Sequence, residues 1–168
     1  SARGARVINI SFGGRGFSQA EQDAIDRAAR RGALVVAAVG NSGGRGGGPD
    51  YPAAYRQVLA VAALGDDGRA LGISLRGDHV ALAAPGRRIA ATAPAGAGDG
   101  LAVRTGTSMA AAVVTGAAAR IIARRPGLDA QQVRAILEST ARDVPPSGAD
   151  SATGSGALDL AAALAAPA

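Results

Sequence analysis

A polar turn that leads into a long run of small side chains is the strongest candidate for chemistry in this sequence. Residues 104–108 are Arg-Thr-Gly-Thr-Ser, and residues 109–123 are mostly alanine, valine and isoleucine. We expect a helix over residues 108–123, capped by Thr105, Thr107 or Ser108. The free N–H groups and the positive dipole end of its first turn would stabilise negative charge developing beside the Ser108 hydroxyl. Ser108 is therefore a candidate nucleophile, although a serine or threonine at such a position is more often a simple cap.

The composition limits the groups that could activate this hydroxyl, because a serine nucleophile needs a general base. The sequence has no lysine and no cysteine, which excludes a serine–lysine dyad, thiolate catalysis and disulfides. An α/β-hydrolase nucleophile elbow is disfavoured because Ala110 replaces its second glycine and no histidine follows the serine. The only histidine, His79, is expected at a strand end or on the surface, with a role as the base as the less favoured alternative.

The overall composition excludes several other classes of function. The 168 residues are 48% hydrophobic, enough for one domain with its own core. No uninterrupted apolar run of about 18 residues occurs, so no membrane span is expected. The net charge of +5 comes from scattered arginines without interleaved aromatics, so nucleic-acid binding is not expected. The glycine-rich residues 40–48 lack the lysine of a phosphate loop and run into proline, which disfavours a nucleotide site.

Alternating apolar runs and helical patterns predict the fold class. Short apolar, often β-branched runs predict strands at residues 6–11, 33–39, 58–64, 80–83, 89–92 and 101–104. Further helices are predicted after two capping boxes, Ser18 with Glu21 and Asp129 with Gln132, and over residues 158–164. The strand–helix–strand order of the first segments implies parallel neighbours. We therefore predict an α/β domain with a parallel β-sheet and flanking helices.

Four segments together resemble the subtilisin-like serine peptidases, the subtilases. They are Gly-Thr-Ser-Met-Ala at residues 106–110, Val-Val-Ala-Ala-Val-Gly-Asn at 35–41, Val-Ile-Asn-Ile-Ser-Phe-Gly-Gly at 7–14 and Ala-Ala-Pro-Gly at 83–86. They occur in the family's order and span nearly the whole chain, so the joint match is far more specific than any one segment. One departure is Ala112-Val113, where the family usually has Pro-His. The resemblance implies that residues 1–168 are the C-terminal part of a subtilisin-like peptidase domain, with a partial subtilisin-like fold.

The same resemblance implies roles for individual residues. Ser108 would be the nucleophile that forms the acyl-enzyme, while its backbone N–H and the Asn41 side chain would bind the oxyanion. The substrate-binding residues would pair with an extended peptide and line the pocket for P1, the residue before the cleaved bond; they are Ser11, Phe12, Gly13, Ala38, Val39 and Gly40.

Asp50 is a candidate determinant of specificity, because the resemblance places it near the bottom of the P1 pocket. A carboxylate there would favour an arginine or lysine side chain through a charge-assisted hydrogen bond. The alternative is that Asp50 caps its turn or pairs with Arg45 or Arg56.

The family's catalytic Asp and His motifs, which precede the serine, are absent from this sequence. We therefore expect a part of a serine endopeptidase that is not competent alone and that needs the missing N-terminal half of the domain or another chain, with self-association as a further expectation. The alternative is a non-catalytic, degenerate subtilase-like module that binds peptides or a protein partner. The resemblance also implies a secreted or cell-envelope protein, although no signal peptide is visible. No cofactor is evident in the sequence. Some subtilases bind calcium, so the resemblance leaves calcium open, but no acidic cluster in this sequence fixes a site.

Overall fold

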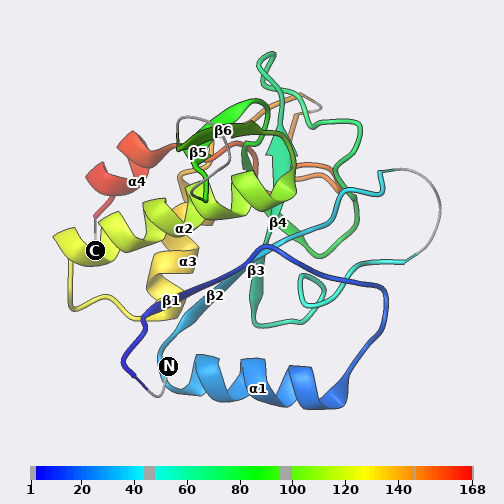
Figure 1. Cartoon of the computed structure of the whole chain (residues 1–168). Coiled ribbons are helices and arrows are strands. Elements are labelled where there is room, and N and C mark those ends of the chain that lie inside the picture. Colours follow the sequence, from blue (N-terminus) through cyan, green and yellow to red (C-terminus); the bar gives the residue numbers. More distant parts are fainter. Residues whose placement is uncertain (1–2, 44–47, 95–99, 146, 168) are drawn as a thin grey trace.

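A four-stranded parallel sheet forms the centre of the molecule (Figure 1). The computed structural model describes residues 3–43, 48–94, 100–145 and 147–167. The strands lie in the order β1 (Val7–Ile10), β2 (Leu34–Ala38), β3 (Val58–Leu64) and β4 (Val80–Pro85). Every residue of β2 and β3 is buried, as is typical of parallel strands covered on both faces. The predicted α/β class with a parallel sheet is confirmed.

Helices cover the two faces of the sheet unequally. Helix α1 (Gln19–Arg30) packs on one face, and three helices cover the other; these are α2 (Thr107–Arg124), α3 (Ala130–Ser139) and α4 (Leu160–Ala165). Successive strand residues point to opposite faces, so Val36 packs in the core under α2 while Val35 packs in the core under α1. The same alternation decides which residues after β2 reach the site.

Helix α2 crosses the sheet and touches all four strands. Its contact face is built from alanines that are at most 3% exposed, namely Ala110, Ala111, Ala117 and Ala118. Such small side chains allow the helix axis to lie close to the sheet, where packing is as dense as in a crystal of small molecules. The position of the first turn of α2, which carries Ser108, is therefore fixed by the sheet beneath it.

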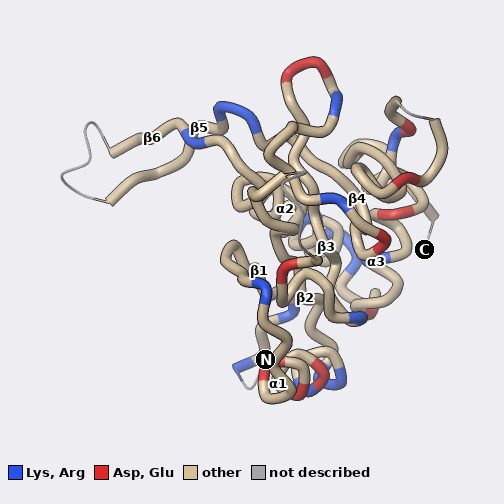
Figure 2. Tube along the Cα trace, turned by 90° about the vertical axis from the view of Figure 1, so that its right-hand side faces the viewer, with Lys and Arg blue, Asp and Glu red and all other residues tan. Residues whose placement is uncertain are grey.

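An antiparallel hairpin projects from the body of the molecule and leads into α2 (Figure 2). It consists of β5 (Ile89–Thr92) and β6 (Leu101–Arg104), and the chain passes from β6 through Thr105 and Gly106 into the helix. The bounds predicted for the strands, α2 and α4 agree with the structure to within two residues.

The predicted capping boxes differ in outcome. At α3, Gln132 N–H donates to Asp129 Oδ1 and Asp129 N–H donates to Gln132 Oε1, each at 2.8 Å, so that box is complete. At α1, Glu21 N–H donates to Ser18 Oγ, but the Glu21 carboxylate accepts from the Tyr55 hydroxyl instead of from Ser18 N–H. The Ser18 N–H donates to the same tyrosine hydroxyl, so a residue distant in sequence replaces half of the predicted box.

Two glycines should respond to alanine with opposite signs of stability change. A Cβ on Gly86 would lie 2.6 Å from Ala63 Cβ and 2.9 Å from Gly106 O, so Gly86→Ala should lower the free energy of unfolding by about 1–3 kcal/mol. Gly116 lies on the exposed side of α2 with open space around it, so Gly116→Ala should raise the free energy of unfolding by about 0.5–1 kcal/mol. Urea unfolding monitored by circular dichroism measures both changes; a stability gain in Gly86→Ala would contradict the close approach.

Candidate active site

The first turn of α2 is capped by a side chain from another part of the chain. Its N-cap residue is Gly106, which offers no side chain, so the predicted cap by Thr105, Thr107 or Ser108 is wrong. The Thr107 N–H donates instead to Asn41 Oδ1 at 2.9 Å. A Cβ on Gly106 would lie 3.2 Å from that same oxygen, and the φ of 151° is one that favours glycine. Gly106 therefore allows the Asn41 amide to lie directly against the start of the helix.

Thr107 completes this connection, and sequence reasoning missed its role. The side chain is fully buried, its hydroxyl donates to Asn41 Oδ1 at 3.2 Å, and its Oγ1 accepts from Gly40 N–H at 3.3 Å. Both hydrogen bonds fix the turn after β2 against α2. Because Thr107 uses Asn41 Oδ1, the Asn41 Nδ2 group is left as a donor that bonds to no described residue. In the sequence, Thr107 was identified only as one of three possible caps of this helix.

Ser108 lies in the second position of α2, between the helix and the end of β1. Its Oγ donates to Ser11 O at 3.0 Å, and the Ser11 hydroxyl donates to Ser108 O at 3.0 Å. The side chain is half-buried, and its backbone N–H in the first turn donates to no described residue. The neighbouring N–H groups are paired, that of Thr107 with Asn41 Oδ1 and those of Met109 and Ala110 with Gly106 O. Two hydrogen bonds to Ser11 thus hold the serine beside the carboxyl end of β1.

A cavity of about 140 Å³ opens beside Ser108. It brings together eight of the nine candidate site residues and adds Thr107; its lining is Ser11, Phe12, Gly13, Ala38, Gly40, Asn41, Asp50, Thr107 and Ser108. The structure does not bring the ninth, Val39, into this cavity. Val39 is fully buried in the core under α1, and its N–H donates to Val61 O at 3.1 Å. The alternation of the strand directs Ala38 and Gly40 to the site and Val39 away from it.

Two glycines make room for the wall that carries Asp50. A Cβ on Gly40, whose φ is 108°, would collide with Asp50 Oδ2 and would lie 2.8 Å from Leu75 Cδ1. A Cβ on Gly13 would lie 2.7 Å from Tyr51 O. Gly14 and Tyr51 exchange both of their backbone hydrogen bonds, which ties this wall to the segment after β1.

The Asp50 carboxylate is half-buried at the side of this cavity. Among residues 3–43, 48–94, 100–145 and 147–167, no arginine pairs with it and no backbone N–H donates to it, so Arg56 is not its partner. Arg45, the other partner considered, lies outside the described residues.

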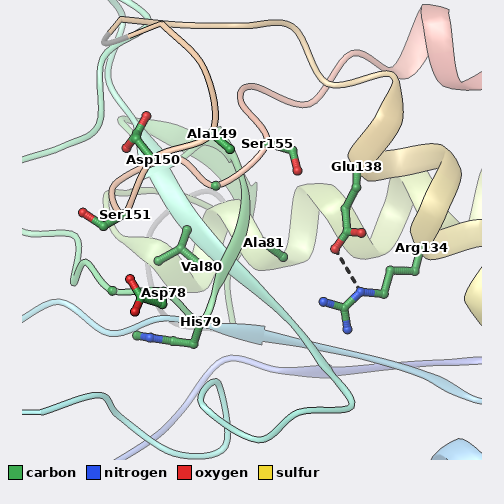
Figure 3. Close-up of a pocket in the computed structure, with 12 residues that line it drawn as sticks. Asp78, His79, Val80, Ala81, Arg134, Glu138, Ala149, Asp150, Ser151 and Ser155 are labelled. Carbon is green, nitrogen blue, oxygen red and sulfur yellow. Dashed lines mark hydrogen bonds and ion pairs between the residues drawn. The ribbon is translucent and has the colours of Figure 1, made fainter.

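His79 lies in a different cavity, of about 440 Å³, and does not line the one beside Ser108 (Figure 3). It directly precedes β4, and its imidazole lies across this cavity from the ion pair that joins Arg134 to Glu138 at 2.9 Å. Burial lowers the pKa of His79 below its ordinary value. The carboxylates of Asp78 and Asp50 act in the opposite direction and raise the pKa, but by less than burial lowers it. Its Nε2 atom is buried without a partner among the described residues. The geometry does not bring this imidazole to the Ser108 hydroxyl.

Within the described part of the chain, no three histidine, cysteine or acidic side chains gather as a group that could hold a metal ion. No helix within those residues is long and apolar enough to cross a bilayer.

Known proteins resemble this chain in both sequence and fold. The protein-family model described as "Subtilase family" matches residues 1–156. Fervidolysin from Fervidobacterium pennivorans is 37% identical over 98% of this chain and 26% of its own length, and subtilisin DY from Bacillus licheniformis is 41% identical over 84% of this chain and 51% of its own length. The crystal structure of fervidolysin, a keratinolytic enzyme related to subtilisin, matches with a TM-score of 0.88 at 36% identity and covers 99% of this chain and 27% of that one.

The family match covers most of the residues, including the strand ends and the helix start that surround the Ser108 cavity. The chain spans 26% and 51% of the lengths of the two relatives named above. On this evidence the chain belongs to the subtilase family, peptidase S8.

Proposed function

We propose that this chain forms the nucleophile-bearing part of a serine endopeptidase and is not competent alone. The observation that supports the proposal best is the convergence of three groups beside one small cavity: the Ser108 hydroxyl, the Ser108 backbone N–H in the first turn of α2, and the Asn41 amide. A hydroxyl nucleophile beside two hydrogen-bond donors is the arrangement that acyl transfer requires.

The proposed reaction begins at Ser108 Oγ. This oxygen attacks the carbonyl carbon of the scissile peptide bond and passes its proton to a base, and the carbonyl oxygen becomes an oxyanion. The Ser108 N–H and Asn41 Nδ2 donate to that oxygen. The tetrahedral intermediate then collapses, the C–N bond breaks, and the amine leaves with the proton from the base. Water subsequently hydrolyses the ester on Ser108.

The base in this proposal comes from outside the 168 residues. The chain has a single histidine, His79, and that residue lines a separate cavity. The Ser108 hydroxyl donates to Ser11 O at 3.0 Å, so the side chain must turn from that carbonyl toward an incoming base. Strand β1 is one edge of the sheet in the described residues, which makes its free edge our candidate for pairing with a segment that carries the base. Pairing of two copies of this chain through the same edge of β1 would compete with the binding of that segment.

The proposed substrate is a peptide or protein. An extended peptide would run beside residues 11–13 and would place its P1 side chain in the cavity of about 140 Å³. We also propose a secreted or cell-envelope location, which rests on the family relationship alone.

The isolated chain should not hydrolyse peptides, because it lacks a base beside Ser108. Purified chain and its Ser108→Ala variant should release fluorophore from a quenched peptide at the same background rate. In a protein that contains this chain together with the catalytic base, here called the base-complete protein, Ser108→Ala should abolish turnover. Turnover by the isolated chain that Ser108→Ala removes would overturn the proposal of an external base, and its loss in His79→Ala would then assign the base to His79. No turnover in the base-complete protein would favour a peptide-binding module without catalysis.

Asn41→Asp should separate the catalytic role of this side chain from its structural one. The carboxylate keeps an acceptor for the Thr107 N–H but removes the Nδ2 donor, so the cap of α2 is preserved. We expect kcat of the base-complete enzyme to fall by at least about 10²–10³, with little change in KM, since the lost bond forms in the transition state. The urea midpoint should stay close to that of the unmodified protein. Equal kcat values in the two proteins would remove Asn41 from the oxyanion site.

Asp50 should set a preference for basic P1 residues. A charge-assisted hydrogen bond of about 1.5–3 kcal/mol would raise kcat/KM for a P1-arginine peptide over a P1-leucine peptide by about 10- to 150-fold. Asp50→Asn keeps the side-chain volume and removes the charge, whereas Asp50→Gly removes both. Both variants should lose most of the arginine preference. If the ratio of the two kcat/KM values is the same in all three proteins, Asp50 does not contact the substrate.

A further inference from the structure

A third cavity, of about 450 Å³, lies beside the segment that leads into the nucleophile turn. Its lining combines apolar side chains with two arginines; the residues are Leu71, Gly72, Ile73, Arg87, Arg88 and Thr105. Thr105 precedes Ser108 by three residues, so their Cα atoms are at most about 11 Å apart. An extended peptide covers that distance with about three residues.

Two chain segments connect this cavity with the Ser108 cavity, which Asp50 also lines. In the first segment, Gly40 and Asn41 line the Ser108 cavity, and the N–H of Gly43 donates to the carbonyl oxygen of Ile73, in the third cavity, at 2.8 Å. The second segment contributes Thr105 to the third cavity, and it contributes Thr107 and Ser108 to the Ser108 cavity.

Asn41 and Gly106 meet between these two cavities, where a Cβ on the glycine would lie 3.2–3.5 Å from the amide atoms. In both segments the Asn41–Gly106 contact therefore stands at the boundary between the residues that line one cavity and those next to the other. If the acyl part of a substrate occupies the Ser108 cavity, the third cavity is the neighbouring site for the leaving-group side.

Of the two arginines that line this cavity, Arg88 has the guanidinium group that is available to a ligand. The neighbouring Arg87 already pairs with Asp66 at 3.5 Å. Within the described residues, no acidic side chain pairs with Arg88, which is exposed. Arg87 and Arg88 lie in the chain between β4 and β5, directly before the hairpin that projects in Figure 2.

The backbone of Arg88 adopts an unusual conformation that ties it to the nucleophile turn. Its φ of 50° lies in the left-handed region, and it is the one residue other than glycine with a positive φ in the described part of the chain. The Arg88 N–H donates to Thr105 Oγ1 at 3.0 Å, so the segment that leads to Ser108 holds this conformation. Residues held in such sparsely populated conformations cluster at ligand and active sites.

We propose that the third cavity binds the leaving-group side of the substrate and that Arg88 selects an acidic side chain there, about two to three residues after the cleaved bond. The inference rests on the proposed peptidase function and adds to it a substrate class: peptides with an aspartate or glutamate on the leaving-group side. Leu71 and Ile73 contact the aliphatic part of that side chain, while Arg88 binds its carboxylate. Arg87 keeps its pair with Asp66.

Two peptides test this binding site directly on the 168-residue chain. They are identical except that glutamates at the second and third positions after the intended cleavage site are replaced by glutamines. NMR titration should give about three- to fivefold tighter binding of the glutamate peptide, the scale of an exposed ion pair. Backbone signals of both Asn41 and Thr105 should shift, because the peptide spans both cavities. The difference in affinity should disappear in Arg88→Gln and persist in Arg120→Gln, which removes another exposed arginine, in α2.

The outcomes separate this inference from the peptidase proposal. Equal affinities of the two peptides, an equal loss in Arg120→Gln, or shifts at Thr105 without shifts at Asn41 would overturn the inference.

Cleavage of the same peptides by the base-complete protein reports on the peptidase proposal independently. Failure to cleave either peptide, with the glutamate preference in binding intact, would reject the peptidase function while retaining the acidic preference of the cavity. Cleavage of both peptides with equal kcat/KM and equal affinity would retain the peptidase and reject the role of Arg88.

Discussion

The contact between Asn41 and Thr107 is the interaction on which the site depends most. It joins the turn after β2 to the first turn of α2, two segments that are 66 residues apart in sequence. One amide oxygen accepts both the backbone N–H and the hydroxyl of Thr107, and the hydroxyl oxygen in turn accepts from Gly40 N–H. Each such bond contributes only about 0.5–1.5 kcal/mol to stability, but leaving the buried groups unpaired would cost more. The network therefore fixes the direction of the Asn41 amide as well as the start of the helix.

Close packing below this network makes its geometry possible. The alanine face of α2 lies on all four strands, and Gly86 approaches Ala63 and Gly106 too closely for a side chain. Gly106 also brings the Asn41 amide against the helix start. Small residues at these positions reduce the distance between segments, so that backbone donors and a side-chain amide face the same small volume. Larger side chains would move the Asn41 amide away from the first turn of α2.

The charged groups around this centre are distributed over separate cavities. Asp50 lines the Ser108 cavity, Arg88 lines the third cavity, and His79 lines another. In the proposed function, opposite charges in two neighbouring cavities would give a bound peptide a direction, because each cavity would favour a complementary part of the peptide. The same distribution leaves Ser108 without a titratable partner among the described residues.

The sequence alone determined the elements whose signals are local. The apolar runs located β3, β5 and β6, and the spacing of Asp129 and Gln132 predicted a complete capping box, because each of these patterns acts within a few residues. The motif order also identified the family and nearly all the residues that line the Ser108 cavity.

Tertiary structure decided the features that join distant segments. Tyr55 replaced half of the predicted box at Ser18, Asn41 replaced the predicted cap of α2, and strand alternation turned Val39 into the core. Local spacing cannot predict these contacts, because the partner that satisfies a backbone N–H or covers a side chain is set by the packing of the sheet against its helices.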